Sequence, residues 1–204
     1  MNFLQFQKLL QGQKVFSTKD IAKECPGFNY VNLVNWQEKG YLIKLRNTWY
    51  AFPEMLQSED DLYFVANQLH RPSYISLETA FRFYNWIPES VFTITSITTA
   101  KPAEWRTPVG HFSYRSIKPR LFFGYLTAKG KNADFNIATP EKTLLDLLYF
   151  HPEYAEYDDF EGLRLNKEEI SGMLNLDRLN NYLELIGSST LETRWGSLKK
   201  YLGL

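Results

Sequence analysis

The first fifty-three residues alternate short amphipathic segments with strong turn signals, and this pattern restricts the fold more than any other in the chain. Residues 3–10 place their apolar side chains on one face of a first helix. Ser17 is positioned to cap a second helix, which Pro26-Gly27 ends. The spacing predicts a third helix from Asn29 to Lys39, closed by Gly40, because glycine tolerates the left-handed conformation that follows a helix.

Two strands follow the third helix, over residues 41–45 and 48–52, with a turn at Arg46-Asn47. Three helices and then a hairpin are the layout of a winged helix-turn-helix, in which the helix after the turn enters the DNA major groove. The pattern therefore predicts a DNA-binding domain over residues 1–53. Such small units also serve as protein-docking modules, and this second interpretation stays open.

The third helix is expected to divide its side chains between the protein core and DNA. Helical spacing turns one set inward, consisting of Tyr30, Leu33, Val34, Gln37 and Trp36, and leaves Asn32, Asn35 and Lys39 outside. Asn can pair with adenine and Lys with guanine or phosphate, so this outer face suits the reading of double-stranded DNA. The predicted DNA-binding residues are Lys19, Asn29, Tyr30, Asn32, Asn35, Lys39, Lys44, Arg46, Asn47 and Thr48.

The chain carries 23 basic and 23 acidic residues, but their distribution is uneven. Residues 1–53 have a net charge of +4, residues 54–70 of −4, residues 71–131 of +6 and residues 132–204 of −6. The second basic block predicts an additional surface for DNA or an acidic partner, formed by Arg115, Lys118, Arg120, Lys129 and Lys131. An ordinary solvated sheet face explains these residues equally well.

The rest of the chain predicts an α+β domain. Acidic residues and an apolar helical pattern make residues 54–70 a hinge and linker helix, and residues 71–204 the C-terminal domain. Strands are expected over residues 91–97, 109–117, 121–126 and 134–138, and helices over residues 76–84, 177–186 and 191–202. A further helix starts at Thr139-Pro140-Glu141, where a capping hydroxyl precedes a proline and an acid.

Three segments in this region carry a family resemblance. They are residues 74–80 (YISLETA), 93–99 (TITSITT) and 138–148 (ATPEKTLLDLL), in this order after the helix-and-hairpin unit. The ordered set resembles the AbiE-type antitoxin family of bacterial transcriptional regulators over most of residues 15–150. The third helix is rich in Asn where many relatives are rich in Arg, so the operator sequence is not carried over.

The resemblance implies a repressor that binds repeats at its own promoter, in an abortive-infection or type IV toxin-antitoxin system. Whether the chain oligomerises on or off DNA stays open, and a homo-oligomer on DNA is one alternative. The resemblance also implies that the C-terminal domain antagonises a nucleotidyltransferase toxin. Two alternatives stay open: a plain winged-helix regulator with a ligand-sensing or oligomerising C-terminal domain, and, less favoured, a nucleotidyltransferase enzyme. In the third segment, the interpretation that we favour is that Glu141 serves the start of its helix and Asp146 pairs with a base in the core. A partner-contacting surface is the alternative.

Catalytic and metal-binding patterns are not legible in the sequence, so no enzyme activity and no cofactor are expected. The string Asp159-Phe160-Glu161 has no Gly-Ser turn about ten residues before it, as nucleotidyl transfer would need, and no phosphate-binding loop precedes any helix. One cysteine and three scattered histidines predict neither a disulfide nor a metal site. No stretch reads as a signal peptide or a membrane span, which predicts a cytoplasmic protein without a membrane partner.

Overall fold

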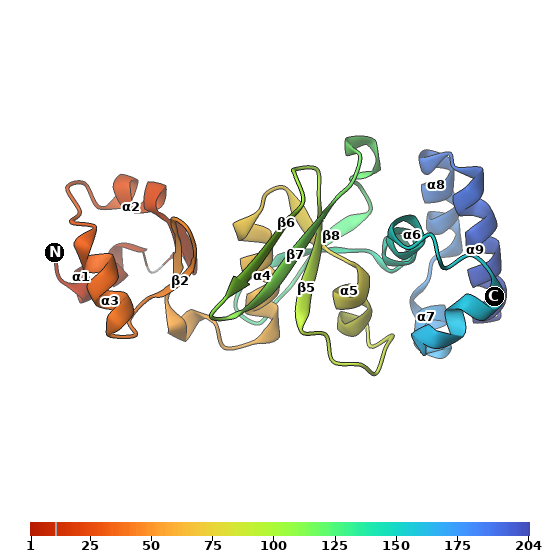
Figure 1. Cartoon of the computed structure of the whole chain (residues 1–204), viewed down its shortest axis with the longest axis horizontal. Coiled ribbons are helices and arrows are strands. Elements are labelled where there is room, and N and C mark those ends of the chain that lie inside the picture. The colour runs from red at the N-terminus through yellow and green to blue at the C-terminus, as the bar shows by residue number, and fades with distance from the viewer. Residues whose placement is uncertain (11) are drawn as a thin grey trace.

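Hydrophobic side chains gather in three clusters that follow one another along an elongated molecule (Figure 1). The computed structural model describes residues 1–10 and 12–204. An N-terminal unit lies at one end, a six-stranded sheet in the middle, and a group of helices at the other end. Helices and sheets are both major components, so the predicted α+β class is confirmed.

The N-terminal unit contains three helices and a three-stranded antiparallel sheet. Its elements are α1 (Phe3–Leu10), β1 (Val15–Ser17), α2 (Thr18–Glu24), α3 (Val31–Glu38), β2 (Ile43–Arg46) and β3 (Trp49–Ala51), with sheet order β1-β3-β2. The Ser17 hydroxyl accepts a hydrogen bond from the Asp20 N–H, and the Asp20 carboxylate accepts one from the Ser17 N–H, so α2 begins in a capping box. Gly40 ends the α3 segment with φ at 71°.

The segment after this unit continues into the next core. A short 3-10 helix η1 (Pro53–Met55) leads to α4 (Glu59–Leu69), which begins with a second capping box between Ser58 and Asp61. The inner side chains of α4 pack on the central sheet, where they contact β4, β5 and β9. Residues 54–70, predicted to form a hinge and linker helix, therefore contain a core helix of the central sheet.

The central sheet mixes parallel and antiparallel pairs. Its strands are β4 (Ser73–Ile75), β5 (Thr93–Thr98), β6 (Ala103–Thr107), β7 (Gly110–Ser116), β8 (Tyr125–Ala128) and β9 (Phe135–Ala138), in the order β6-β7-β5-β4-β9-β8. The pairs β5-β7 and β4-β9 are parallel and the other pairs are antiparallel. Helix α5 (Leu77–Phe83) follows β4 directly and packs on β5.

The strand predicted over residues 121–126 is wrong in its position. Pro119 starts a 3-10 helix η2 (Pro119–Leu121), and the chain turns at Gly124, which has φ at 72°, before β8 begins at Tyr125. A residue with a left-handed backbone conformation interrupts a strand, so the apolar residues 121–126 cannot form one continuous strand. Strands β1, β4 and β6 were not expected at all.

The C-terminal third of the chain is helical. It contains α6 (Pro140–Phe150), a 3-10 helix η3 (Tyr157–Leu163), α7 (Lys167–Met173), α8 (Leu176–Ile186) and α9 (Ser189–Leu202). Residues 141–148 of α6 are buried all round, because α5 packs on this helix from one side and α8 and α9 from others. Within the described part of the chain, every helix is too short or too polar to cross a bilayer.

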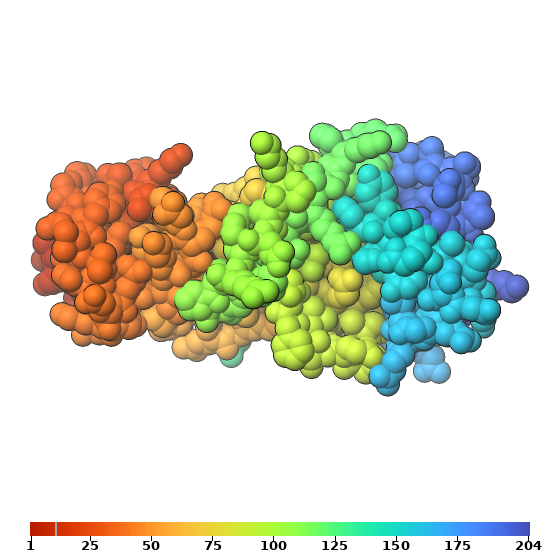
Figure 2. All heavy atoms as spheres, viewed as in Figure 1, coloured from red at the N-terminus to blue at the C-terminus, as the bar shows by residue number. Residues whose placement is uncertain are grey.

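The N-terminal unit is docked on the central sheet through the outer face of its own small sheet. Val15, Leu45 and Ala51 belong to the same hydrophobic cluster as the inner side chains of α4 and of the central strands. The Arg46 guanidinium lies 4.1 Å from the centre of the Trp105 ring on β6. Figure 2 shows the surface indented where these two parts meet. We call this region the joint.

A buried carboxylate holds the joint together. Asp61 accepts hydrogen bonds from the Ser58 hydroxyl, the Asn132 amide and the Gln57 N–H, and it pairs with Lys14 at 3.3 Å. Burial acts to raise the pKa of Asp61, but the hydrogen bonds outweigh it and lower the pKa to about 2. Asp61 is therefore charged at neutral pH and links the N-terminal unit to two segments of the central part.

Candidate nucleic-acid interface

Aromatic side chains fix the position of α3. Leu33 and Trp36 are buried, and the Trp36 ring lies 4.8 Å from the ring of Phe6 and 5.7 Å from that of Phe28. Edge and tilted contacts of this kind add to the free energy gained by burying the rings. Helix α3 therefore has one defined inner face and leaves the opposite face to solvent.

The outer face of α3 differs from the prediction. Tyr30 and Val34, expected to pack inward, are 45% and 55% exposed, while Asn32, expected outside, is half-buried. Trp36 takes the centre of the inner face and thereby rotates the helix relative to the predicted pattern. Asn35 and Lys39 are exposed as expected.

The outer face also includes side chains that the sequence did not single out. Val31 is 62% exposed, and together with Val34 and Asn35 it forms a ridge one helical turn long. Glu38 is exposed on the next turn. The face is therefore partly apolar and less basic than the charge of the segment suggests.

Three predicted contact regions meet around Thr18. Its N–H donates to the Thr48 carbonyl at 2.9 Å, which fixes the hairpin turn beside the start of α2. Its carbonyl accepts from the Tyr30 hydroxyl at 3.4 Å, which brings the start of α3 to the same place. Lys19 is exposed next to this point, and the Asn29 side chain accepts a hydrogen bond from the Val31 N–H.

The hairpin presents most, though not all, of its predicted residues to solvent. Lys44, Asn47 and Thr48 are exposed. Arg46 lies in the joint, where burial lowers its pKa and its guanidinium stacks on Trp105. A phosphate contact predicted for Arg46 would therefore require this stacking to be broken, which the sequence could not indicate because Trp105 lies on a distant strand.

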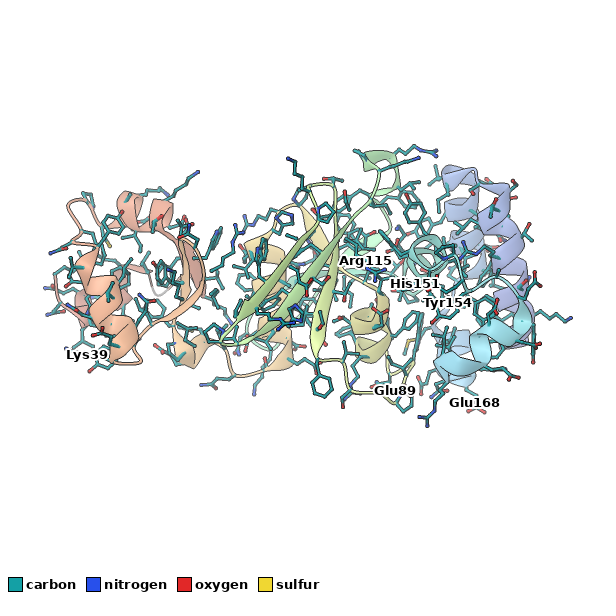
Figure 3. All side chains as sticks on the ribbon, viewed as in Figure 1. Lys39, Glu89, Arg115, His151, Tyr154 and Glu168 are labelled. Atoms are coloured by element: carbon teal, nitrogen blue, oxygen red, sulfur yellow. The ribbon has the colours of Figure 1, made fainter. Side chains whose placement is uncertain are left out.

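The second predicted basic surface is divided among separate places. The Arg115 guanidinium lies 3.1 Å from Nε2 of His151. Figure 3 shows Arg115 and His151 beside α6, at the far side of the sheet from the N-terminal unit. Arg120 donates to the Ile186 carbonyl at the end of α8, and Lys118 is exposed near it.

The remaining two lysines of that set lie at the joint. Lys129 pairs with Asp134 at 2.8 Å, and the hydrogen bond to that carboxylate raises the pKa of Lys129. The Lys131 N–H donates to the Asp60 carboxylate at the start of α4. The five residues thus form no common basic surface.

The segments that carry the family resemblance meet in the core. Asp146 of α6 pairs with Lys142 and accepts hydrogen bonds from the Tyr74 and Ser76 hydroxyls, at 3.1 Å and 2.8 Å. The Lys142 ammonium also donates to the Tyr74 hydroxyl at 2.9 Å. Burial raises the pKa of Asp146, and the ammonium and both hydroxyls oppose that rise. The expectation that Asp146 pairs with a base in the core is confirmed.

Glu141 serves a neighbouring helix as well as its own. Its carboxylate accepts a hydrogen bond from the Asn175 N–H at 2.8 Å and lies 3.5 Å from the Arg178 guanidinium of α8. Its position in the first turn of α6 also suits the helix dipole, as expected. Both acids of this segment therefore have structural partners.

The acidic string is used for capping. The Asp159 carboxylate accepts hydrogen bonds from the N–H groups of Ala155 and Glu156, and these bonds lower the pKa of Asp159. Phe160 is buried between Asp159 and the exposed Glu161. Across the residues that the structure describes, no group of three His, Cys, Asp or Glu side chains is arranged to hold a metal ion.

Comparisons with known proteins do not assign the chain to a family. A scan against protein-family models finds none that matches it, and a search of the curated proteins finds no significant match.

Proposed function

We propose that this chain is a DNA-binding transcriptional regulator and that its N-terminal unit is a winged helix-turn-helix. The observation that carries the proposal is the order α1, β1, α2, α3, β2, β3 with sheet order β1-β3-β2. This arrangement supports α3 as the helix that enters the major groove and the β2-β3 hairpin as the wing. The exposed position of α3 at the far end of the molecule is consistent with access to DNA (Figure 1).

The proposed interface reads bases through α3 and holds phosphates around it. Asn35 pairs with adenine, and Val31 and Val34 contact thymine methyl groups. Lys39, at the end of α3 (Figure 3), contacts phosphate or guanine. The phosphate contacts come from Lys19, Asn29, Tyr30, Lys44, Asn47 and Thr48, all of which are exposed. Asn32 is half-buried and Arg46 stacks in the joint, so both are secondary in this proposal.

Replacing Asn35 by Ala is expected to reduce discrimination between the chain's own upstream DNA and random DNA by about tenfold, because one bidentate base contact is lost. Lys39→Ala should instead weaken binding to both DNAs and reduce the salt slope by about one. Fluorescence anisotropy of labelled duplexes across a salt series measures both effects.

Asn180→Ala is the matched control, because it removes an exposed Asn amide from α8, far from the proposed interface. Equal affinity of the unaltered chain for upstream and random DNA would contradict sequence-specific binding. A discrimination unchanged by Asn35→Ala would remove α3 from its proposed role.

We extend the proposal to an antitoxin on the strength of the family resemblance. The resembling segments form β4 with α5, β5, and β9 with α6, which pack together in the central part. The function implied is antagonism of a nucleotidyltransferase toxin encoded beside this chain. A plain regulator with a ligand-sensing C-terminal part is the second candidate, and the cavity of about 560 Å³ at the joint favours it.

Co-expression separates these two candidates. The full chain is expected to restore the growth of cells that express the neighbouring nucleotidyltransferase. The Asn35→Ala variant should restore growth equally, because antagonism is assigned to the central and C-terminal parts. Both chains are expressed from unrelated promoters, so that repression plays no part. Continued toxicity at equal chain levels would favour the plain regulator.

A further inference from the structure

A cavity of about 210 Å³ lies where the loop after β7 meets the start of α9. The loop lines it with Lys118 and Arg120, and the opposite wall comes from Ser188, Thr190 and Arg194. We call it the α9 cavity. It is smaller than the pockets of roughly 300–1,000 Å³ that hold drug-sized ligands, so it suits a single small group.

The α9 cavity is lined by three cations and by no carboxylate. The cations are Lys118, Arg120 and Arg194. None of them forms an ion pair with another residue that the structure describes. Like charges around one small space repel each other unless an anion lies between them. The lining therefore favours an anion.

Arg194 is the cation for which burial is most costly. It is 9% exposed, and burial lowers its pKa. Its Nε donates to the Tyr154 carbonyl at 3.0 Å and its Nη2 to the His151 carbonyl, but its Nη1 takes part in no hydrogen bond among the described residues. The Glu153 carboxylate attracts Arg194 without forming an ion pair, and it is bonded to His151 at 2.8 Å. Buried charges are normally paired, so the missing counter-charge points to a ligand.

Arg120 is held at the start of α9. It is exposed, and its Nη1 donates to the carbonyl of Ile186, the last residue of α8, at 3.3 Å. Ser188, two residues further along the chain, caps α9. The Arg120 guanidinium therefore lies beside the first turn of α9, and only one of its nitrogens is bonded to a described residue.

The first turn of α9 supplies further donors. The Ser188 hydroxyl accepts a hydrogen bond from the Leu191 N–H. The N–H groups of Ser189 and Thr190 have no partner among the described residues, and neither has the Thr190 hydroxyl. Free N–H groups and the helix dipole favour an anion at a helix N-terminus. These donors act together with the three cations of the same cavity.

The acid in the first turn of α9 does not neutralise this lining. Helical spacing places Glu192 on the face opposite to Thr190 and Arg194, both of which line the cavity. Glu192 is exposed on that opposite face. The excess of positive charge in the α9 cavity therefore remains.

We propose that the α9 cavity binds a terminal phosphate group, carried by a small phosphate ester or by free phosphate. Lys118 and Arg120 bind its oxygens from one side, and the N–H groups of Ser189 and Thr190 bind them from the other. Arg194 adds its charge. A terminal phosphate carries about −1.5 to −2 at pH 7, which matches several cations. The bound group would link the loop after β7 to α9, and so hold the C-terminal helices against the central sheet.

The test is calorimetric titration of the full chain, without DNA and at constant ionic strength, so its outcome is independent of operator binding. The probes are adenosine monophosphate, its 3′,5′-cyclic form and inorganic phosphate. Adenosine monophosphate should bind at least tenfold more tightly than the cyclic form, because a diester has less charge and no free end to enter the cavity. Arg120→Gln should weaken the binding of adenosine monophosphate and of inorganic phosphate about tenfold, since a charge-assisted bond is lost.

Thr190→Val is the second variant, and it keeps the shape of the side chain. It should weaken binding several-fold and leave the melting temperature unchanged, because Thr190 is exposed and its hydroxyl has no partner among the described residues. Lys200→Gln is the matched control, since it removes an exposed cation from the last turn of the same helix, and it should bind normally.

Inorganic phosphate distinguishes the source of the group. Binding weaker than that of adenosine monophosphate identifies an organic ester as the ligand, and equal or tighter binding identifies the free ion. Absence of binding by both would overturn the proposal. So would a cyclic form that binds as tightly as the better of the two, or an Arg120→Gln variant that binds as well as the unaltered chain.

Discussion

Replacing Asp146 by Ala lowers the free energy of unfolding by about 3–5 kcal/mol, because it leaves the Lys142 ammonium buried without its counter-charge. Lys142 is 1% exposed and Asp146 is fully buried. The remaining partner of the ammonium would be the Tyr74 hydroxyl, which cannot neutralise it. Urea denaturation followed by circular dichroism measures the change.

The double variant Lys142→Met with Asp146→Leu should recover most of this loss. Replacing a buried ion pair by apolar side chains of similar size is often neutral or stabilising, because neither charge then has to leave water. Asp158→Ala, which removes an exposed carboxylate, serves as the control. A double variant as unstable as Asp146→Ala would show that the hydrogen bonds of Asp146, and not its charge, stabilise this core.

Replacing Phe6 by Ala is expected to lower the free energy of unfolding by about 3–5 kcal/mol and to abolish the proposed DNA binding, because it leaves a cavity behind α3. The Phe6 ring is fully buried and contacts the rings of Phe16, Phe28, Trp36 and Phe52 at centroid distances of 4.8–6.2 Å. Thermal unfolding and anisotropy with upstream DNA measure the two effects.

Leu4→Ala on the same helix is the matched control, since Leu4 is 73% exposed and should change stability by no more than about 0.5 kcal/mol. A Phe6→Ala variant that still binds upstream DNA with full affinity would show that α3 does not depend on this core, or that another part of the chain binds the DNA.

The N-terminal unit was largely predictable because its signals are local. Ser17 and Gly40 act through the backbone of their own segment, and both helix ends lie where these residues predict them. Strand β1 escaped prediction because three residues are too few to show an alternating pattern. The rotation of α3 could not be predicted from the sequence either, because aromatic rings from other segments determine which face of so short a helix is buried.

The contact between Arg46 and Trp105 depends on residues that only the fold brings together. No sequence pattern near Arg46 points to Trp105, which lies on a strand of the central sheet. The Lys142–Asp146 pair was partly predictable, because a lone acid in a Leu-rich helix needs a base nearby and Lys142 lies one helical turn away. Its hydroxyl partners come from β4 and could not be predicted.

The order of strands in the central sheet has a consequence for synthesis on the ribosome. The rings that pack behind α3 all come from the first 52 residues, so the N-terminal unit can fold as soon as this stretch emerges. Strand β4 pairs with β5 on one side and with β9 on the other, and β9 is made only at residues 135–138. Until then, β4 has an open edge, which exposes the nascent chain to aggregation. During a translational pause before residue 135, the nascent chain would therefore have a folded N-terminal unit and an incomplete central sheet.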